Sequence, residues 1–492
     1  MLNGKCLYLC ATMLILLLTL IIYIAVLFVV SRLTARRTDN ATFFRGKRRS
    51  PWYMVAFGMV GASVSGVTFV SVPGMVNTTG MTYLQTCMGF IVGYFVVAFV
   101  LLPVYYRLNL TSIYTFLDRR LGLRSYRTAA LFFLLSKMAA SALKFYVVCL
   151  ILQRFVLDAY GIPFIVTVAV LAVVIWLYTR RGGIRTLVWT DTFQTLCMLT
   201  ALVLIIVGVM QALGMSVGDA IEAIAADDRS RIFVFDDWIS TQNFWKQFIS
   251  GAFIVVVMTG LDQDMMQKNL TCRTLREAQK DMCTYGFAFV PVNLLFLSLG
   301  ILLSMLAAQQ GITLPTSGDE LLPMFAATGA LGNVVLVCFT IGVLAASFSS
   351  ADSALTAMTT STCVDLFRRQ DDVALRKRVH LVLIIVFAVV ILIVDAIGSR
   401  SLIDTIYTLV GYTYGPLLGM FAFSLLTRRR TSDRAVPLIA IASPLLCFAI
   451  SILSEQLCHY RFGYELLLLN GMLTFAGLWC LTKKERLPHS HE

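Results

Sequence analysis

Charged residues are scarce in this chain of 492 residues, because Asp, Glu, Lys and Arg make up only 14% of it. A water-soluble protein of this length needs a polar exterior, so the scarcity excludes a soluble fold. The hydrophobic residues, 58% of the total, fall in runs of about 20, long enough to cross a hydrocarbon core roughly 30 Å thick. We therefore predict an all-α polytopic membrane protein that has the lipid bilayer as its partner.

Residues and motifs typical of enzymes are also few. An intramembrane hydrolase would need a nucleophile beside a base, and a zinc site would need closely spaced ligands. The sequence contains neither a Walker motif nor a Gly-x-Gly-x-x-Gly stretch after a strand, and its 12 Cys form no C-x-x-C pair. We therefore predict that the protein is not an enzyme. The few His residues lie at span ends or in tails: His380, His459, His489 and His491.

Basic residues are concentrated in alternate connections between the apolar runs. Only six of the 40 Lys and Arg fall in the opposite set of connections. Basic connections stay in the cytoplasm, so the asymmetry predicts a multi-pass protein of the cell membrane (plasma or inner membrane). Its N-terminus lies outside and its C-terminus in the cytoplasm, and the net charge of +13 indicates topology rather than a nucleic-acid partner. The basic connections, with 31 Lys and Arg, are 31–51, 106–127, 178–186, 268–281, 366–379, 427–435 and 482–492.

Termini on opposite sides of the membrane require an odd number of spans. The apolar runs predict about 13 transmembrane helices. Their approximate positions are 9–31, 52–76, 82–106, 127–153, 162–180, 187–212, 244–267, 283–308, 331–363, 379–397, 402–426, 436–455 and 463–482.

Two of these spans are interrupted near mid-membrane. Gly and Ser cluster at 58–66 in the second span, and the segment 260–264 breaks the apolar run of the seventh. The two spans lie five apart and enter the membrane from opposite sides. Broken helices in corresponding positions are typical of an inverted repeat that surrounds a central site. Small residues that only permit close helix packing remain an alternative.

Hydroxyls and a carboxylate gather in the ninth span, at 345–353. Such groups are costly at mid-membrane unless they face a cavity or a ligand. Several oxygens near one point suit a hard cation such as Na⁺. The alternative is that the serines bond to carbonyl groups of the preceding helical turn, although this does not explain Asp352.

Five stretches of the sequence carry a resemblance to a known family. The chain resembles the sodium:solute symporter family, which is typified by sodium/proline and sodium/galactose transporters and includes sodium/sialic acid relatives. The matching stretches run from the second span to the eleventh, in family order. They are GASVSGVTFVSVPG (61–74), GGIRTLVWTDTFQ (182–194), GLDQDMMQKNL (260–270), AASFSSADSA (345–354) and GYTYGPLLGMF (411–421).

The resemblance implies a LeuT-type fold, with a 5+5 inverted repeat and alternating access around a midplane site. The protein would then be a sodium-coupled symporter that imports a small polar solute and functions as a monomer, with Na⁺ as the coupling ion and the only metal. Residues 1–51 would hold the first transmembrane helix and a basic cytoplasmic loop. Residues 52–430 would form the ten-helix transport core, and residues 431–492 two further helices and a short cytoplasmic tail.

The resemblance also implies site residues. Asp191 matches an aspartate on the ion path or at an extra ion site, with Asp352 as a second candidate; pairing of Asp191 with Arg185 or another basic residue nearby is the alternative. Ser63 stands where some relatives carry Asp or Asn, so a relative's substrate cannot be transferred to this chain. The sodium-binding candidates are the carbonyls of Gly61, Val64 and Ala346 and the hydroxyls of Ser349 and Ser350.

Two lysines near the centre of the fourth span, Lys137 and Lys144, favour an acidic solute: an organic acid, a sialic acid or an amino acid. They lie seven residues apart, on one helix face, and a membrane-centre lysine costs roughly 2.5–3.5 kcal/mol. An internal ion pair with Asp262, Asp264 or Asp352, or snorkelling, is the alternative, and sodium/sugar symport or proton coupling stays open. The other substrate-binding candidates are Ser63, Ser65, Thr68, Gln85, Asp262 and Thr408.

Overall fold

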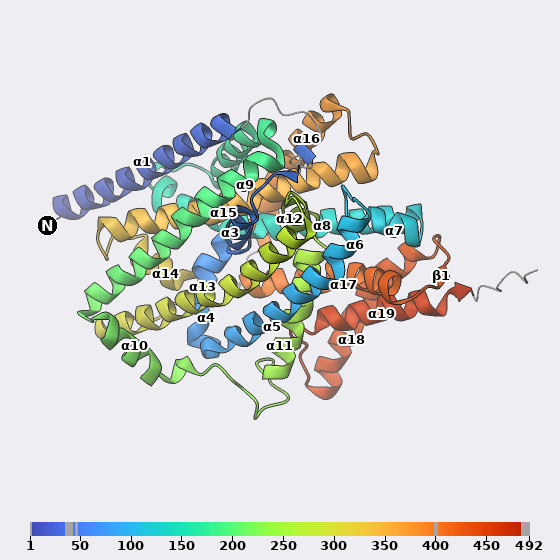
Figure 1. Cartoon of the computed structure of the whole chain (residues 1–492). Coiled ribbons are helices and arrows are strands. Elements are labelled where there is room, and N and C mark those ends of the chain that lie inside the picture. The colour runs from blue at the N-terminus through green and yellow to red at the C-terminus, as the bar shows by residue number, and fades with distance from the viewer. Residues whose placement is uncertain (1, 35–42, 45–47, 398–401, 484–492) are drawn as a thin grey trace, which may run out of the picture.

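The computed structural model describes residues 2–34, 43–44, 48–397 and 402–483, most of which are helical (Figure 1). Two strands of two residues each, β1 (Arg430–Thr431) and β2 (Thr482–Lys483), pair antiparallel. The prediction of an all-α protein is therefore confirmed. The longer helices are α1 (Leu2–Thr34), α8 (Leu123–Leu152), α9 (Phe164–Leu213), α13 (Leu275–Gln309), α15 (Asn333–Ser361), α16 (Val373–Ile397), α17 (Leu402–Leu426) and α18 (Val436–Cys458).

Shorter elements complete the bundle. The α-helices among them are α3 (Trp52–Ser63), α4 (Gly66–Thr79), α5 (Tyr83–Val96), α6 (Leu102–Arg107), α7 (Thr115–Arg120), α10 (Val217–Ala226), α11 (Phe244–Val255), α12 (Gln263–Asn269), α14 (Leu321–Ala326) and α19 (Leu466–Cys480). The π-helical turns are η3 (Val97–Leu101), η4 (Gln153–Leu157), η7 (Val256–Gly260) and η9 (Thr362–Leu366). The 3₁₀ turns are η2 (Gly80–Thr82), η5 (Asp158–Tyr160), η6 (Asp228–Ser230) and η8 (Gly318–Glu320).

Nine helical segments among the described residues are long and apolar enough to span a membrane, and a bent pair makes up to ten. One of the nine, 66–107, covers parts of two predicted spans, and three shorter apolar helices were predicted as whole or partial spans. Multiple spans are confirmed, whereas the count of 13 stays a prediction. In Figure 1, α10 and α14 lie at one end of the bundle and α7 and β1 at the other, with α9, α13 and α15 running between them.

Helix α15 lies at the centre of the bundle. In its apolar stretch 83% of the residues are buried, against 22% in α16 and in α18. It packs against α9, α8, α4 and α1. The serine-rich segment of α15 is therefore enclosed by protein, while α16 and α18 expose apolar side chains such as Ile393 and Leu445, as expected of helices that face lipid.

Both predicted helix breaks are present. The first separates α3 from α4, where Val64 and Ser65 adopt extended backbone angles. The second follows the π-helical turn η7, and the chain bends by 70° before α12 begins at Gln263. Non-helical backbone at membrane depth is tolerated only where it is buried in protein or lines a cavity. These two breaks, each of which opens a run of five predicted spans, place the non-helical backbone at the centre of the fold.

Helix α9 contains two predicted spans joined at a bend. Gly183 has φ 64°, in the left-handed region that favours glycine. A Cβ at this position would lie 2.5 Å from the Cα of Phe43. The bend therefore lies at the connection predicted between 180 and 187, where basic residues also gather.

The long segment between α9 and α11 is held by side chains rather than by regular structure. Its surface helix, α10, begins with a reciprocal cap in which Ser216 Oγ accepts a hydrogen bond from Asp219 N. After α10, hydrogen bonds from Arg229 hold the pKa of Asp227 below its usual range. The Nε2 of Gln85 donates to the carbonyl of Gln242 at 2.9 Å, which fixes the end of this segment against α5.

Candidate functional site

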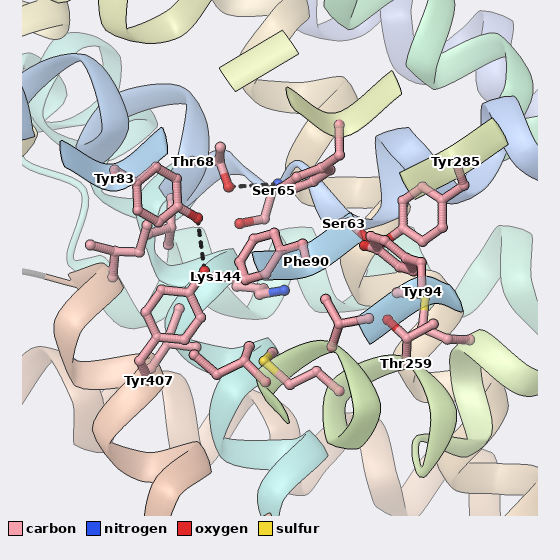
Figure 2. A pocket seen from close by; sticks show the side chains of 18 of the residues that line it. Ser63, Ser65, Thr68, Tyr83, Phe90, Tyr94, Lys144, Thr259, Tyr285 and Tyr407 are labelled. Carbon is pink, nitrogen blue, oxygen red and sulfur yellow. Dashed lines mark hydrogen bonds between the residues drawn. The ribbon is translucent and has the colours of Figure 1, made fainter. Parts of the chain in front are cut away.

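A pocket opens beside the break between α3 and α4 (Figure 2). Side chains from α5, α8, α11, η7, α12, α13 and α17 complete its walls. Its volume is about 90 Å³, below the roughly 300–1,000 Å³ typical of ligand sites, so it suits a small solute in this conformation. The polar and aromatic lining residues are Ser63, Ser65, Thr68, Tyr83, Phe90, Tyr94, Lys137, Lys144, Thr259, Tyr285, Phe289 and Tyr407.

Hydrogen bonds fix much of this lining. Ser65 caps α4, and its backbone N–H donates to Thr68 Oγ1 at 3.3 Å. Ser63 Oγ is hydrogen-bonded to the hydroxyl of Tyr285. On the other wall the hydroxyls of Tyr83 and Tyr407 are hydrogen-bonded to each other (Figure 2), at a distance of 2.8 Å. The broken helix therefore presents hydroxyls to the pocket, opposite a wall of aromatic rings.

The two lysines of α8 differ in their surroundings. Lys137 Nζ lies 2.8 Å from Asp264 Oδ2 and 3.1 Å from Asp262 Oδ2, so its charge is balanced by the internal ion pair considered from sequence. Lys144 has no ion pair or hydrogen bond among the described residues, and its side chain extends into the pocket (Figure 2). A buried ammonium group is costly without a partner, so Lys144 is the group best suited to meet an anion from outside.

An ion-pair network continues from Lys137 towards α9. Lys268, on α12, lies 2.8 Å from Asp191 Oδ2 and 3.8 Å from Asp264 Oδ1, and its side chain is 2% exposed. Lys268 was not predicted as a site residue, although its spacing of four residues from Asp264 was a signal for a helical ion pair. The alternative partner considered for Asp191, the side chain of Arg185, lies outside the described residues.

Asp191 also connects the network to α15. Ser349 Oγ donates to Asp191 Oδ1 at 2.7 Å, and Ser353 Oγ donates to Asp191 Oδ2 at 3.3 Å. The spacing of four residues predicted one shared face for these two serines, and both hydroxyls point to the same carboxylate. Asp352 faces a different neighbour, because its Oδ2 accepts a hydrogen bond from the hydroxyl of Tyr178 at 3.1 Å.

The sodium-binding candidates lie where the first helix break meets α15. The hydroxyl of Ser350 lies 3.2 Å from the carbonyl oxygen of Ala62 and 3.1 Å from that of Ala346. Gly61 allows α3 to approach α9 closely, since a Cβ there would lie 1.9 Å from Thr195 Oγ1. The extended backbone at Val64 leaves carbonyl groups outside the helical hydrogen-bond pattern. This oxygen-rich contact has the donor chemistry that a hard cation requires.

Three substrate candidates do not line the pocket. Gln85 is fully buried and bonds to the segment before α11. Asp262 caps α12 and accepts a hydrogen bond from Tyr414 at 2.7 Å, so it belongs to the ion-pair network. Thr408 is exposed, and the preceding residue, Tyr407, lines the pocket in its place. One position along a helix turns a side chain by about 100°, which separates these two neighbours.

Comparison with known proteins places this geometry in a family. A sequence model of the sodium:solute symporter family matches residues 43–438. The chain is 23% identical to a sodium/sialic acid symporter of Proteus mirabilis over 84% of this chain and 85% of that protein. It is 25% identical to the human sodium/iodide cotransporter over 77% of this chain but only 60% of that protein.

Solved structures show the same fold. A Na⁺-coupled sialic acid symporter in a substrate-bound, outward-open state superimposes with a TM-score of 0.82 at 21% identity, covering 95% of this chain and 99% of that one. A transporter of the nucleobase-cation-symport-1 family in a closed conformation matches with a TM-score of 0.58 at 17% identity, covering 91% of this chain and 96% of that one. The LeuT-type fold predicted from sequence is confirmed, and the family match extends over most of the chain. The protein therefore belongs to the sodium:solute symporter family, whose members are membrane transporters rather than enzymes.

Proposed function

We propose that this protein imports a small acidic solute together with Na⁺ by alternating access around the pocket. The unpaired ammonium group of Lys144 supports this assignment, since it stands among hydroxyls and aromatic rings in a site of small volume. A carboxylate or an inorganic anion would supply the missing partner. The charge of Lys137 is already neutralised by its ion pairs with Asp262 and Asp264. The anion site therefore centres on Lys144.

We further propose that Na⁺ binds at the first helix break, to the carbonyls of Gly61, Val64 and Ala346 and the hydroxyl of Ser350. Ser349 would join it by turning from its present bond with Asp191. Binding at this break would link the position of α4, which lines the pocket, to the position of α15. Sodium and solute would in this way stabilise the same arrangement of the two helices, which is how differential binding couples two ligands.

We also propose that the protein acts as a monomer in the cell membrane, with its N-terminus outside and its C-terminus in the cytoplasm. The distribution of basic residues supports the orientation.

Thermal unfolding of the purified protein tests the anion site. Lactate, iodide, a sialic acid and galactose are each added in Na⁺ or in K⁺. We expect at least one anion to raise the Tm in Na⁺ only, and a ligand at 100 times its Kd contributes about 2.7 kcal/mol. The Lys144→Met variant should lose this response while the Lys246→Met variant, which removes a surface charge over the Tyr460 ring, keeps it. An anion that stabilises Lys144→Met as strongly as the wild type would contradict the proposal.

A further inference from the structure

One fully buried amide connects α19 to a helix that forms part of the pocket wall. Asn470 of α19 is 0% exposed, and α19 packs closely against α17 (Figure 1). Its Nδ2 donates to the backbone carbonyl of Tyr412 at 2.9 Å and to that of Gly411 at 3.0 Å. Gly415 leaves room for this contact, since a Cβ there would lie 2.4 Å from Asn470 Cγ. The amide of one helix is therefore inserted against the backbone of the other.

Pro416 explains why α17 needs a donor from another helix. In an α-helix the N–H of each residue donates to the carbonyl four residues earlier, and proline has no N–H. The carbonyl of Tyr412, four residues before Pro416, therefore lacks its helical donor. Asn470 donates to this same carbonyl. Because a buried carbonyl without a donor is costly, Asn470 replaces the hydrogen bond that the proline removes.

The orientation of the Asn470 amide is itself fixed by the two C-terminal helices. Its Oδ1 accepts a hydrogen bond from Ser443 Oγ of α18 at 2.9 Å. The hydroxyl of Thr474 lies 2.6 Å from Ser443 Oγ and donates to the backbone carbonyl of Asn470 at 3.0 Å. All three side chains are buried. Because the oxygen of the amide is bound to α18, its N–H groups are directed towards α17.

The proline separates two halves of α17 that have different surroundings. The C-terminal half, 417–426, is anchored at its end, where Arg120 donates to the carbonyls of Ser424 and Thr427. The N-terminal half, 402–412, contributes to the pocket. The pocket-lining residues of α17 all precede Pro416: Ile403, Ile406 and Tyr407. The direction of the pocket-lining half therefore depends on the hydrogen bonds beside the proline.

We propose that Asn470 is a positioning residue for the solute pocket. By donating to the carbonyl that Pro416 leaves free, it holds the N-terminal half of α17 in the direction that places Tyr407 in the pocket wall. The proposal rests on the proposed function insofar as this pocket binds the solute, whereas the support of α17 by Asn470 does not depend on it. It gives the helices after the predicted ten-helix core a role in transport, because α18 and α19 set the shape of the site.

Hydrogen exchange of the purified full-length protein, without any solute, tests the support of α17. In Asn470→Leu the backbone amides of 402–412 should exchange faster than in the wild type, while those of 417–426 should not change. A global loss of stability would instead accelerate exchange in both halves. Ser443→Ala, which frees the amide to turn, should cause a smaller acceleration in 402–412 and keeps the test open if Asn470→Leu folds poorly. Asn293→Leu, which removes an equally buried amide that donates within its own helix, should leave α17 unchanged.

Removal of the proline tests the reason for the contact. Pro416→Ala supplies an N–H for the Tyr412 carbonyl, so the exchange of 402–412 should be about the same in Pro416→Ala and in Pro416→Ala/Asn470→Leu. An Asn470→Leu effect of equal size in both backgrounds would overturn the proposal, because Asn470 would then act independently of the proline. Wild-type exchange in both halves of α17 in Asn470→Leu would overturn it as well.

Uptake measurements separate this proposal from the proposed function. The KM for the anion that stabilises the wild type should rise roughly tenfold in Asn470→Leu, since one misplaced hydrogen bond is worth about that factor. An unchanged KM beside the local change in exchange would overturn the positioning role at the pocket. A wild type that recognises none of the anions would overturn the proposed function instead, and the exchange of 402–412 then decides whether Asn470 positions α17.

Discussion

The buried ammonium groups of Lys137 and Lys144 show that the neighbouring side chains decide the role of a lysine. Lys137 and Lys144 share a helix and a face, about 10 Å apart along the axis at 1.5 Å per residue. Carboxylates of α12 neutralise the first, whereas no described carboxylate pairs with the second. The sequence predicted that both were costly at this depth, but only the ion pairs of Lys137 with Asp262 and Asp264 show which of them is free to meet a solute.

Lys268 is expected to stabilise the folded protein through its ion pair with Asp191. The Lys268→Met variant leaves Asp191 without its cation, and breaking a buried pair from one side costs about 3–5 kcal/mol of unfolding free energy. Thermal unfolding in detergent measures the loss. The double variant Lys268→Met/Asp191→Asn should recover most of it, since no uncompensated charge remains. A single variant as stable as the wild type would contradict the ion pair.

The pocket lining includes the predicted positions that a helix break fixes, and it departs from the prediction where the rotation of a helix decides which side chain faces inward. Ser63, Ser65 and Thr68 line the pocket, because a helix break exposes them whatever the rotation of the rest of the span. Thr408 faces outward and its neighbour Tyr407 faces inward, a difference that apolar periodicity in an almost uniformly apolar span does not resolve.

At the level of elements, α4 and α15 approach each other so closely that glycine is required between them. A Cβ on Gly66 would lie 2.1 Å from Ser347 Oγ but 3.4 Å from Ser347 Cβ. The Ser347 hydroxyl is itself buried without a partner among the described residues. Ser347 Oγ is therefore the atom that a side chain at position 66 would clash with.

This contact gives a reciprocal prediction. Gly66→Ala should lower the Tm, with a cost of about 1–3 kcal/mol as for other overpacked sites. Ser347→Ala should be neutral or stabilising, because it removes an unpaired buried hydroxyl. The double variant should recover the loss, since the nearest atom then lies at ordinary contact distance. If Gly66→Ala lowers the Tm equally in the wild-type and Ser347→Ala backgrounds, an atom other than Ser347 Oγ limits the approach of the two helices. Thermal unfolding of the four proteins completes the cycle.

The elements themselves were largely predictable. A cluster of Gly and Ser marked the first helix break, the segment 260–264 marked the second, and the basic connection at 178–186 marked the bend in α9. What the sequence could not show is the continuity of structure across turns: 66–107 forms one nearly continuous helical path over two predicted spans. Hydropathy placed the connection between 76 and 82, where the 3₁₀ turn η2 lies, but it does not report that this connection is itself helical.

For the whole molecule, orientation in the membrane is the main prediction. Cys458 at the end of α18 and Cys480 at the end of α19 are exposed free thiols, and the two helices cross the membrane in opposite directions in the predicted topology. A membrane-impermeant maleimide should label Cys458 in intact cells and Cys480 only after permeabilisation. The signal that is lost in Cys458→Ser comes from Cys458, and the signal that is lost in Cys480→Ser comes from Cys480. Labelling in the reverse order would place the C-terminus outside.

The unpaired charge of Lys144 has a consequence for the energetics of the transport cycle. A bound anion cancels the charge of Lys144, so the loaded carrier moves the charge of its Na⁺, whereas the empty pocket carries the charge of Lys144 itself through the conformational change. An elementary charge that crosses the full field exchanges about 2.3 kcal/mol with a membrane potential of 100 mV. A potential that is negative inside therefore favours the inward step of the Na⁺-loaded carrier and acts against the outward return of the empty carrier.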